Sequence, residues 1–343
     1  MEQLLRIDSE ITNRCNAACP LCARTGTFGA GVSEVLFKGG YKDLPLDFVD
    51  DIINSDSAID LKKWSYCGNY GDPFMHPKVY DIADKVASKD IKQIFDTNGG
   101  MRDKVFWSEM GKFKSLEINF AIDGLSDTNE IYRVKTNFNK IMENTEAFIK
   151  AGGKANWVFI VFSHNEHQVE EAKELSKKIG FRNFEYKIST RGFNFNVDAG
   201  KSPDAPRTKE IKVHKKVKTS ADIKIPKDKK FRLNEIVHKE VNCKAIYQNQ
   251  FFVTPDPWIL PCCYVHAEVA KRTHGVYKKD SEFFDFMINN NVKYDMTKNS
   301  FDDIVTSYRD NLDVLRSHWK SRRITICNKI CGSNRANKTI RYN

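Results

Sequence analysis

The sequence lacks the segments that would place it in or across a membrane. None of its apolar runs approaches the roughly 20 residues that a membrane-spanning helix needs. It opens MEQLLRIDSEITNRC, without the cationic stretch and following apolar segment of a secretory signal peptide. We therefore expect a cytoplasmic protein with no membrane partner.

The composition also lacks the low hydrophobic content that is typical of disordered chains. Hydrophobic residues make up 41% of the 343 residues and aromatic residues 12%, which is ordinary for a globular protein. This length accommodates one large α/β domain with a small appended domain.

Base-stacking aromatic residues are missing from the most basic part of the chain. The net charge is +10, and residues 201–232 are rich in Lys, Pro and Asp with few large apolar side chains. Such a segment is typical of a solvated linker. The alternative is a patch that attracts an anionic substrate or nucleic acid. The missing aromatic residues disfavour nucleic acid.

The nine cysteines do not fit a disulfide framework, because a reducing compartment favours metal or catalytic roles. They fall into two groups with Cys67 alone between them; the first is Cys15, Cys19 and Cys22, and the second is Cys243, Cys262, Cys263, Cys327 and Cys331. Two groups of thiols predict two metal sites.

Short apolar runs alternate with amphipathic helical patterns over the first half of the chain. We expect strands at 4–12, 61–67, 91–97, 115–123, 155–162 and 183–189, and helices at 46–54, 77–89, 103–112, 138–152 and 166–180. This alternation predicts an α/β fold with a parallel sheet and right-handed crossovers. A partial (β/α)6 TIM-like barrel fits the pattern, and so does a doubly wound sheet.

The pattern changes after the basic segment. Residues 251–262 predict a β-hairpin with its turn at Pro255–Pro257, and residues 300–322 predict a helix with Ser300 as its N-terminal cap. The expected organisation is a barrel over 1–195, a basic linker over 196–240, and a small cluster-binding domain over 241–343.

The first cysteine group lies in the loop after the first predicted strand, as Cys15-x-x-x-Cys19-x-x-Cys22. In a βα barrel this loop lies at the face that carries the chemistry. Thiolates at short spacing select iron–sulfur clusters or zinc. A structural zinc site needs a fourth ligand, and the nearest histidine, His76, is distant in sequence.

CxxxCxxC after a first strand resembles the signature of the radical S-adenosylmethionine (SAM) superfamily. The resemblance implies a [4Fe–4S] cluster with three cysteine ligands, whose open iron chelates SAM. It further implies that an electron from a reductant such as flavodoxin or ferredoxin cleaves SAM to a 5′-deoxyadenosyl radical, which abstracts a hydrogen atom from a substrate.

Later strand ends resemble the SAM-binding segments of that family. Gly71-Asp72-Pro73 is similar to its GGEP segment, where backbone carbonyls and the acidic side chain receive the SAM ammonium; the alternative is an ordinary turn. Thr97-Asn98-Gly99 is similar to its TNG segment.

Two further segments complete the resemblance. Asp123-Gly followed by Tyr132-Arg133 implies that Arg133 pairs with the SAM carboxylate and that Asp123 faces the radical or the ribose. Asn129 stands where the family has histidine, and we assign it no role. Asn165 is a candidate partner of the ribose or adenine. For Asn98 and Asn165 the alternative role is a helix cap.

The second cysteine group resembles the twitch and SPASM auxiliary-cluster domains. The resemblance implies one further [4Fe–4S] cluster, bound by Cys243, Cys262, Cys327 and Cys331. Four thiolates also suit structural zinc.

Cys67 and Cys263 are left over, and we hypothesise that one of them donates a hydrogen atom to a substrate radical. The alternative is a pair of inert buried thiols.

The substrate is not specified by these motifs. Twitch and SPASM relatives mostly modify peptides and proteins, or oxidise small alcohols and sugars. We expect a peptide or protein side chain as substrate, with dehydrogenation of a small polar metabolite as the alternative and a non-catalytic iron–sulfur protein as a third. Because the first strand begins near residue 4, we expect any leader-binding domain to be missing or supplied separately.

Overall fold

The computed structural model describes most of the predicted barrel and parts of the C-terminal region. The described residues are 4–20, 22, 24, 40–162, 164–188, 241, 243–273, 282–320, 327, 331 and 341–342. The basic segment 201–232, and with it the predicted linker over 196–240, lies outside these residues.

A nine-stranded sheet forms the centre of the fold, in the order β8-β7-β1-β2-β3-β4-β5-β6-β9. The six predicted strands are present as parallel neighbours: β1 (Arg6–Ser9), β2 (Lys63–Tyr66), β3 (Lys92–Thr97), β4 (Leu116–Ala121), β5 (Lys154–Val161) and β6 (Asn183–Ile188). This order confirms the α/β prediction of a partial TIM-like barrel and excludes a doubly wound sheet, because each strand pairs with the next along the chain.

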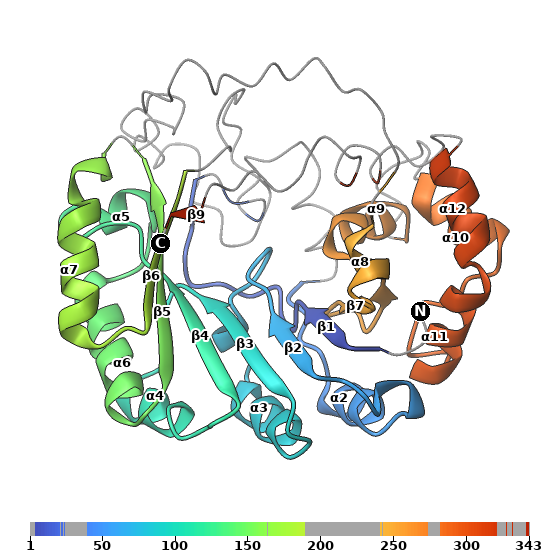
Figure 1. Ribbon diagram of the computed structural model, residues 1–343, viewed down its shortest axis with the longest axis horizontal. Coiled ribbons are helices and arrows are strands. Elements are labelled where there is room, and N and C mark those ends of the chain that lie inside the picture. The colour runs from blue at the N-terminus through green and yellow to red at the C-terminus, as the bar shows by residue number, and fades with distance from the viewer. Residues whose placement is uncertain are drawn as a thin grey trace.

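Helices follow the strands and cover the outer face of the curved sheet (Figure 1). They are α2 (Leu46–Ile53), α3 (Val79–Ala87), α4 (Lys104–Met110), α6 (Phe138–Lys150) and α7 (Val169–Ile179), with the short α5 (Asn129–Tyr132) after β4. Local sequence fixes their ends. Asp103 and Asn137 cap α4 and α6 by accepting backbone N–H groups, and Gly180 ends α7 at a φ of 100°.

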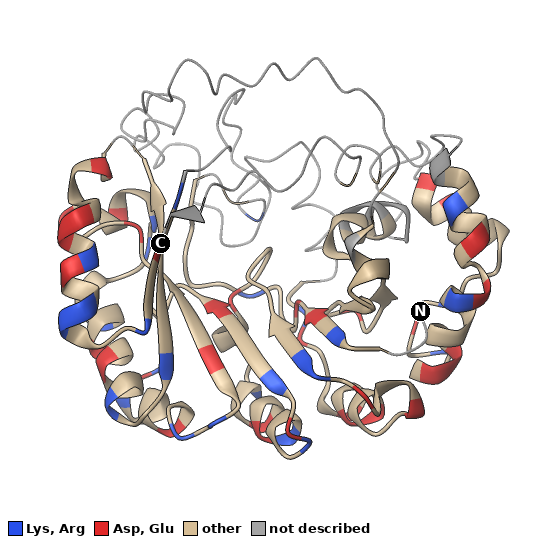
Figure 2. Cartoon of the chain, in the orientation of Figure 1, with Lys and Arg blue, Asp and Glu red and all other residues tan. Residues whose placement is uncertain are grey.

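The two faces of the sheet differ in character because side chains alternate along each strand. The helix-facing side is apolar and fully buried, with Trp64, Phe95 and Phe120 in its core. The opposite face lines the barrel interior and carries polar side chains such as Asp96 and Asn119. Figure 2 shows charged positions along the strands as well as on the outer helices.

The predicted C-terminal hairpin is present and continues the barrel sheet. It consists of β7 (Gln250–Val253) and β8 (Ile259–Leu260), and β7 pairs in parallel with β1. At the other edge β9 (Arg341–Tyr342) pairs antiparallel with β6. The hairpin thereby brings the C-terminal region beside the strand that leads to Cys15.

The C-terminal helices differ in part from the prediction. The helix expected over 300–322 is two helices, α11 (Phe301–Asp310) and α12 (Leu312–Lys320), and Ser300 caps the first as predicted. Three more helices, which the sequence did not predict, are α8 (Lys244–Tyr247), α9 (Cys263–Thr273) and α10 (Glu282–Asn289). Within the described ranges no helix is long and apolar enough to cross a bilayer.

Candidate functional site

The three N-terminal cysteines lie in the segment after β1. Backbone and side chains shape this segment locally: Cys22 N–H donates to the Cys19 carbonyl at 3.1 Å, and Ala17 N–H points at Cys15 Sγ at 3.4 Å. The cysteines pack with Tyr132 and Phe162 in a small apolar group. The loop therefore places Cys19 in an apolar group and leaves Cys15 and Cys22 half-buried at its edge.

Burial acts on the protonation of two of these thiols. It raises the pKa of Cys15 well above its ordinary value and that of Cys19 to about 11. In the part of the chain that the structure describes, no three His, Cys, Asp or Glu side chains are placed to hold a single metal ion. Three cysteine sulfurs at this short spacing fit the donor set of a [4Fe–4S] cluster.

Glu10, directly after β1, holds the loop that follows β2. Its carboxylate is fully buried and accepts the backbone N–H groups of Asn69, Tyr70 and Gly71 at 3.2, 2.8 and 2.7 Å. Burial raises the pKa of Glu10 to about 8, although these hydrogen bonds lower it. The sequence analysis missed this residue, whose only signal is a carboxylate on the interior-facing side of a strand.

Asp72 joins the second and third strand ends. Its carboxylate accepts hydrogen bonds from Phe74 N–H at 3.0 Å, Thr97 Oγ1 at 2.9 Å and Asn98 N–H at 2.8 Å. Both carboxylate oxygens thus have protein donors, and burial raises the pKa of Asp72. The Asp72 side chain therefore holds the loop after β2 against the loop after β3. The backbone carbonyls around Asp72 are then the groups that could accept hydrogen bonds from an ammonium.

Asn98 connects the same loops to the cysteine segment. Its Nδ2 donates to Asn16 Oδ1 at 2.8 Å and lies 3.9 Å from Cys15 Sγ. Asn98 caps no helix, because the next helix, α4, begins at Lys104 and is capped by Asp103. The segments that resemble GGEP and TNG meet beside the first cysteine.

Gly71 lies where two backbone segments touch. A Cβ at this position would come within 2.1 Å of the Thr12 carbonyl oxygen. The next N–H, of Asp72, donates to the Arg14 carbonyl at 2.7 Å, and Pro73 opens the short helix η3 (Pro73–Met75). Gly71 is required because only a residue without a side chain permits this approach.

Arg133 follows α5 and forms a buried ion pair with Asp123. The Nε–Oδ2 distance is 2.6 Å, Asp123 is fully buried, and Arg133 Nη1 lies 3.8 Å from Cys19 Sγ. Burial lowers the pKa of Arg133, but Asp123 and Cys19 raise it by more, so the guanidinium stays charged. Asp123 also accepts Ile160 N–H at 2.6 Å, so its carboxylate is fixed from two sides and orients Arg133.

Asn129 and Asn165 have structural roles around Asp123. Asn129 Oδ1 accepts the Asp123 N–H at 2.9 Å, a role the sequence analysis did not assign. Asn165 donates both amide N–H groups to backbone carbonyls, those of Asp123 at 2.9 Å and Ile160 at 3.0 Å. Since an amide has two N–H groups, neither is left for the predicted contact with ribose or adenine. Nor does Asn165 cap a helix through its side chain.

The C-terminal cysteines influence one another electrostatically. Cys243 precedes α8, Cys262 follows β8, and Cys327 and Cys331 both lie in helical turns. Burial raises the pKa of Cys262, and the neighbouring thiols of Cys263, Cys327 and Cys243 raise it further. Burial likewise raises the pKa of Cys243, to which the Cys331 thiol contributes. The auxiliary ligand set of Cys243, Cys262, Cys327 and Cys331 stays a prediction.

Cys67 lies between the two groups of cysteines. Its N–H donates to the Ser9 carbonyl at 2.7 Å, which sets it at the carboxyl end of β2. Burial raises the pKa of Cys67, and the Asp8 and Asp96 carboxylates and the Cys263 thiol raise it further. The Cys263 thiol thus acts electrostatically on Cys67.

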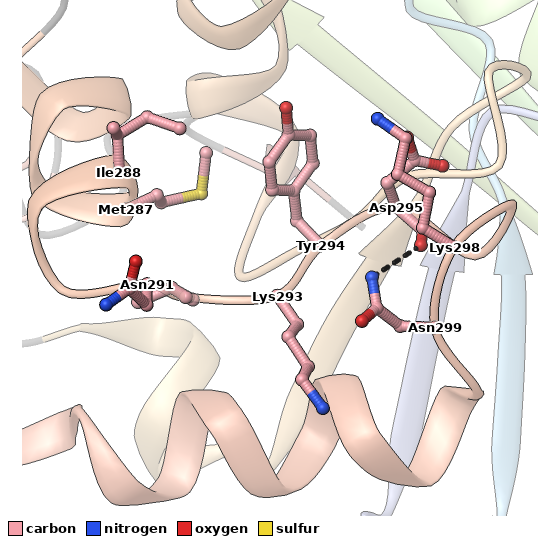
Figure 3. Close-up of a pocket in the computed structure, with 9 residues that line it drawn as sticks. Met287, Ile288, Asn291, Lys293, Tyr294, Asp295, Lys298 and Asn299 are labelled. Atoms are coloured by element: carbon pink, nitrogen blue, oxygen red, sulfur yellow. Dashed lines mark hydrogen bonds and ion pairs between the residues drawn. The ribbon is translucent and has the colours of Figure 1, made fainter.

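A surface cavity of about 260 Å³ lies elsewhere, between α10 and α11 (Figure 3). Met287, Tyr294, Asp295 and Lys298 are among the residues that line it, and none of the predicted site residues does. We do not assign the chemistry to this cavity.

Comparison with known proteins adds evidence for the family. The sequence profile of the Radical SAM superfamily matches residues 9–176. No curated protein sequence matches the chain.

Among solved structures, SuiB from Streptococcus suis bound to S-adenosylmethionine is similar at a TM-score of 0.53 and 14% identity, covering 77% of this chain and 61% of SuiB. SuiB bound to its precursor peptide SuiA is similar at 0.51 and 13% identity, covering 82% of this chain and 62% of SuiB. At these identities the likeness shows the fold alone, and the chain spans less than two thirds of the length of SuiB.

The matched segment contains the three cysteines, both loops that meet at Asp72, and the Asp123–Arg133 pair. The parallel sheet and the CxxxCxxC loop after its first strand agree with that match. The chain is therefore similar to the radical SAM superfamily over residues 9–176.

Proposed function

We propose that this chain uses Cys15, Cys19 and Cys22 to bind a [4Fe–4S] cluster and the adjoining loops to bind SAM. The observation that supports this most is the meeting of separate strand ends beside one thiol: Asp72 bonds to Asn98, and Asn98 reaches Cys15. When bound, the cluster and SAM supply the chemistry of hydrogen-atom abstraction. The protein holds the substrate C–H in place and excludes water.

Arg133 is the residue we propose for the SAM carboxylate. Asp123 fixes its guanidinium through Nε, and the Nη1 group faces Cys19. A guanidinium held in this way offers preoriented N–H groups to a carboxylate. The backbone carbonyls of the 69–73 loop are proposed for the ammonium, since Glu10 fixes that loop by its N–H groups.

An auxiliary [4Fe–4S] cluster is proposed at Cys243, Cys262, Cys327 and Cys331. Their mutual electrostatic influence supports one shared site. Cys67 or Cys263 is proposed as a hydrogen-atom donor to a substrate radical, supported by the raised pKa of Cys67, which keeps its S–H protonated. Cys263→Ala with unchanged product would remove that role from Cys263.

The proposed substrate is a peptide or protein side chain, and the proposed electron donor is a flavodoxin or ferredoxin. The fold shared with SuiB, whose structure includes a precursor peptide, supports the peptide proposal. Dehydrogenation of a small polar metabolite is the second candidate, favoured by the polar barrel interior. A non-catalytic role is disfavoured by the SAM-binding loops beside the cysteines.

The experiment is an iron count on the anaerobically reconstituted chain. Two clusters predict about eight irons per chain, and replacing all three N-terminal cysteines by Ala should leave about four. Cys243→Ala together with Cys262→Ala should remove the four irons of the proposed auxiliary cluster. Zinc in place of the second set would refute the auxiliary cluster alone, whereas unchanged iron in the N-terminal variant would refute the primary site.

A further inference from the structure

The interior face of the barrel carries a continuous ladder of side-chain amides. Asn183 donates to Asn156 at 2.8 Å, Asn156 donates to Asn119 at 2.9 Å, and Asn119 donates to Asp96 Oδ1 at 2.7 Å. These residues occupy matching positions on β6, β5, β4 and β3, so each bond crosses one strand boundary. The ladder runs in one direction and ends on a carboxylate.

Asp96, at the end of the ladder, is exposed and lies two positions before Asn98. The described part of the chain gives its carboxylate no ion-pair partner within 4 Å, whereas the neighbouring interior carboxylate, Asp8, is paired with Arg6 at 2.8 Å. Asp96 therefore offers a carboxylate that no cationic side chain in the described part of the chain neutralises within 4 Å.

Ser65 adds a second and independent feature on the same wall. It lies opposite Asp8 on the adjacent strand, so its side chain faces the interior between Asp8 and the position of Ile94. Ser65 is only 8% exposed, and within the described structure its hydroxyl oxygen is buried with no hydrogen-bond partner. Buried hydroxyl groups are rarely left unpaired, so this one requires a partner that the chain does not supply.

We propose that Asp96 and Ser65 form the subsite that recognises an ammonium or guanidinium group of the substrate. This inference rests on the proposed function, because the subsite matters to the reaction only if SAM binds at the adjoining strand ends. An ammonium or guanidinium offers several N–H donors and a positive charge, which match one carboxylate with free acceptor sites and one hydroxyl. Asn119 is a positioning residue, since it reaches the cation only through Asp96.

The test uses the full chain with its iron restored and SAM present. The probes are Nα-acetyl-arginine methylamide and its neutral isostere, Nα-acetyl-citrulline methylamide, with binding followed by saturation-transfer NMR. We expect the arginine probe to bind at least about tenfold more tightly than the citrulline probe, as a charged hydrogen bond would give.

The variants separate recognition from folding. Asp96→Asn keeps an acceptor for Asn119 but removes the charge, and should weaken the arginine probe about tenfold while leaving the citrulline probe unchanged. Ser65→Ala should weaken binding of the arginine probe about two- to tenfold. Asn119→Ala should lower the affinity for the arginine probe relative to the affinity for the citrulline probe. Asp84→Asn, an exposed site on α3, is the matched control and should change neither probe.

Equal affinity for both probes, no binding of the arginine probe, or wild-type affinity in Asp96→Asn would overturn the proposal. SAM affinity, measured on the same samples by calorimetry, separates this outcome from failure of the proposed function. If SAM binding is lost while the preference for the arginine probe remains, only the proposed function is refuted. If SAM binds but the two probes bind equally well, only the cation subsite is refuted.

Discussion

Buried carboxylates determine the geometry of the site at the scale of single residues. Glu10, Asp72 and Asp123 follow β1, β2 and β4, and each is at most 3% exposed. Each accepts backbone N–H groups from a loop or strand that is distant in sequence. Such carboxylates are costly to bury unless their hydrogen bonds are satisfied, so they fix the loops that contact them.

The raised pKa of Glu10 predicts a pH-dependent stability. Its ordinary pKa is 4.5 and its folded pKa is about 8. Between these values the folded chain binds more protons than the unfolded chain, so this group's contribution to the free energy of unfolding falls as pH rises. Glu10→Gln cannot titrate and should remove that decline, which is on the order of a few kcal/mol.

Thermal or denaturant unfolding between pH 5 and pH 8 measures this difference. Glu143→Gln, on the exposed side of α6, is the matched control and should follow the wild-type profile. Parallel profiles for wild type and Glu10→Gln would contradict the account of Glu10.

The second prediction at this scale concerns Gly71. An added methyl group would lie 2.1 Å from the Thr12 carbonyl oxygen, so Gly71→Ala must displace backbone. We expect a loss of at least about 1–3 kcal/mol in the free energy of unfolding, together with weaker SAM binding. Gly68→Ala is the control, because its nearest contacts would be 3.4 Å away. Equal stability of the two variants would show that the close approach is not required.

The residue types of the site were predictable, but the partners of several residues were not. The strand-end positions of Asp72, Asn98 and Arg133 follow from the alternation of strands and helices. The commitment of both Asn165 N–H groups to backbone carbonyls does not, because it depends on contacts between distant segments. Glu10 and Asn129 were missed for the same reason.

At the scale of elements, one ion pair ties α5 to the end of β4. Asp123 and Arg133 are ten positions apart, and their side chains are 0% and 14% exposed. Asp123→Asn should lower the free energy of unfolding by about 3–5 kcal/mol, since it leaves a buried guanidinium without its counter-charge. Chemical denaturation measures the loss.

The control for that prediction is the surface pair of α6. Glu146 and Lys150 are 43% and 76% exposed, so Glu146→Gln should cost no more than about 0.5 kcal/mol. If Asp123→Asn costs as little as Glu146→Gln, the pair does not hold α5 to the sheet.

Local signals predicted the elements better than their pairing. The six strands and the hairpin have clear alternation and turn residues, and Ser300 marks the start of α11. The parallel pairing of β7 with β1 joins segments more than 240 positions apart, and no local pattern encodes it. The interruption at Asn311 was missed because the apolar spacing continues across it.

At the scale of the whole molecule, a single sheet connects the two groups of cysteines. β1 leads to Cys15, and its neighbour β7 leads through β8 to Cys262. The sequence predicted two thiol groups and assigned them to separate domains. Because β8 runs antiparallel to β7, Cys262 follows β8 toward the amino end of β1, whereas Cys15 follows the carboxyl end of β1.

The central claim is that the chain cleaves SAM at the N-terminal cysteines. The most direct measurement is 5′-deoxyadenosine and methionine formation by anaerobically reconstituted protein given SAM and a strong reductant. The account predicts that both products form and that Cys19→Ala abolishes them. A preparation with its cluster loaded and SAM bound that releases neither product would contradict it.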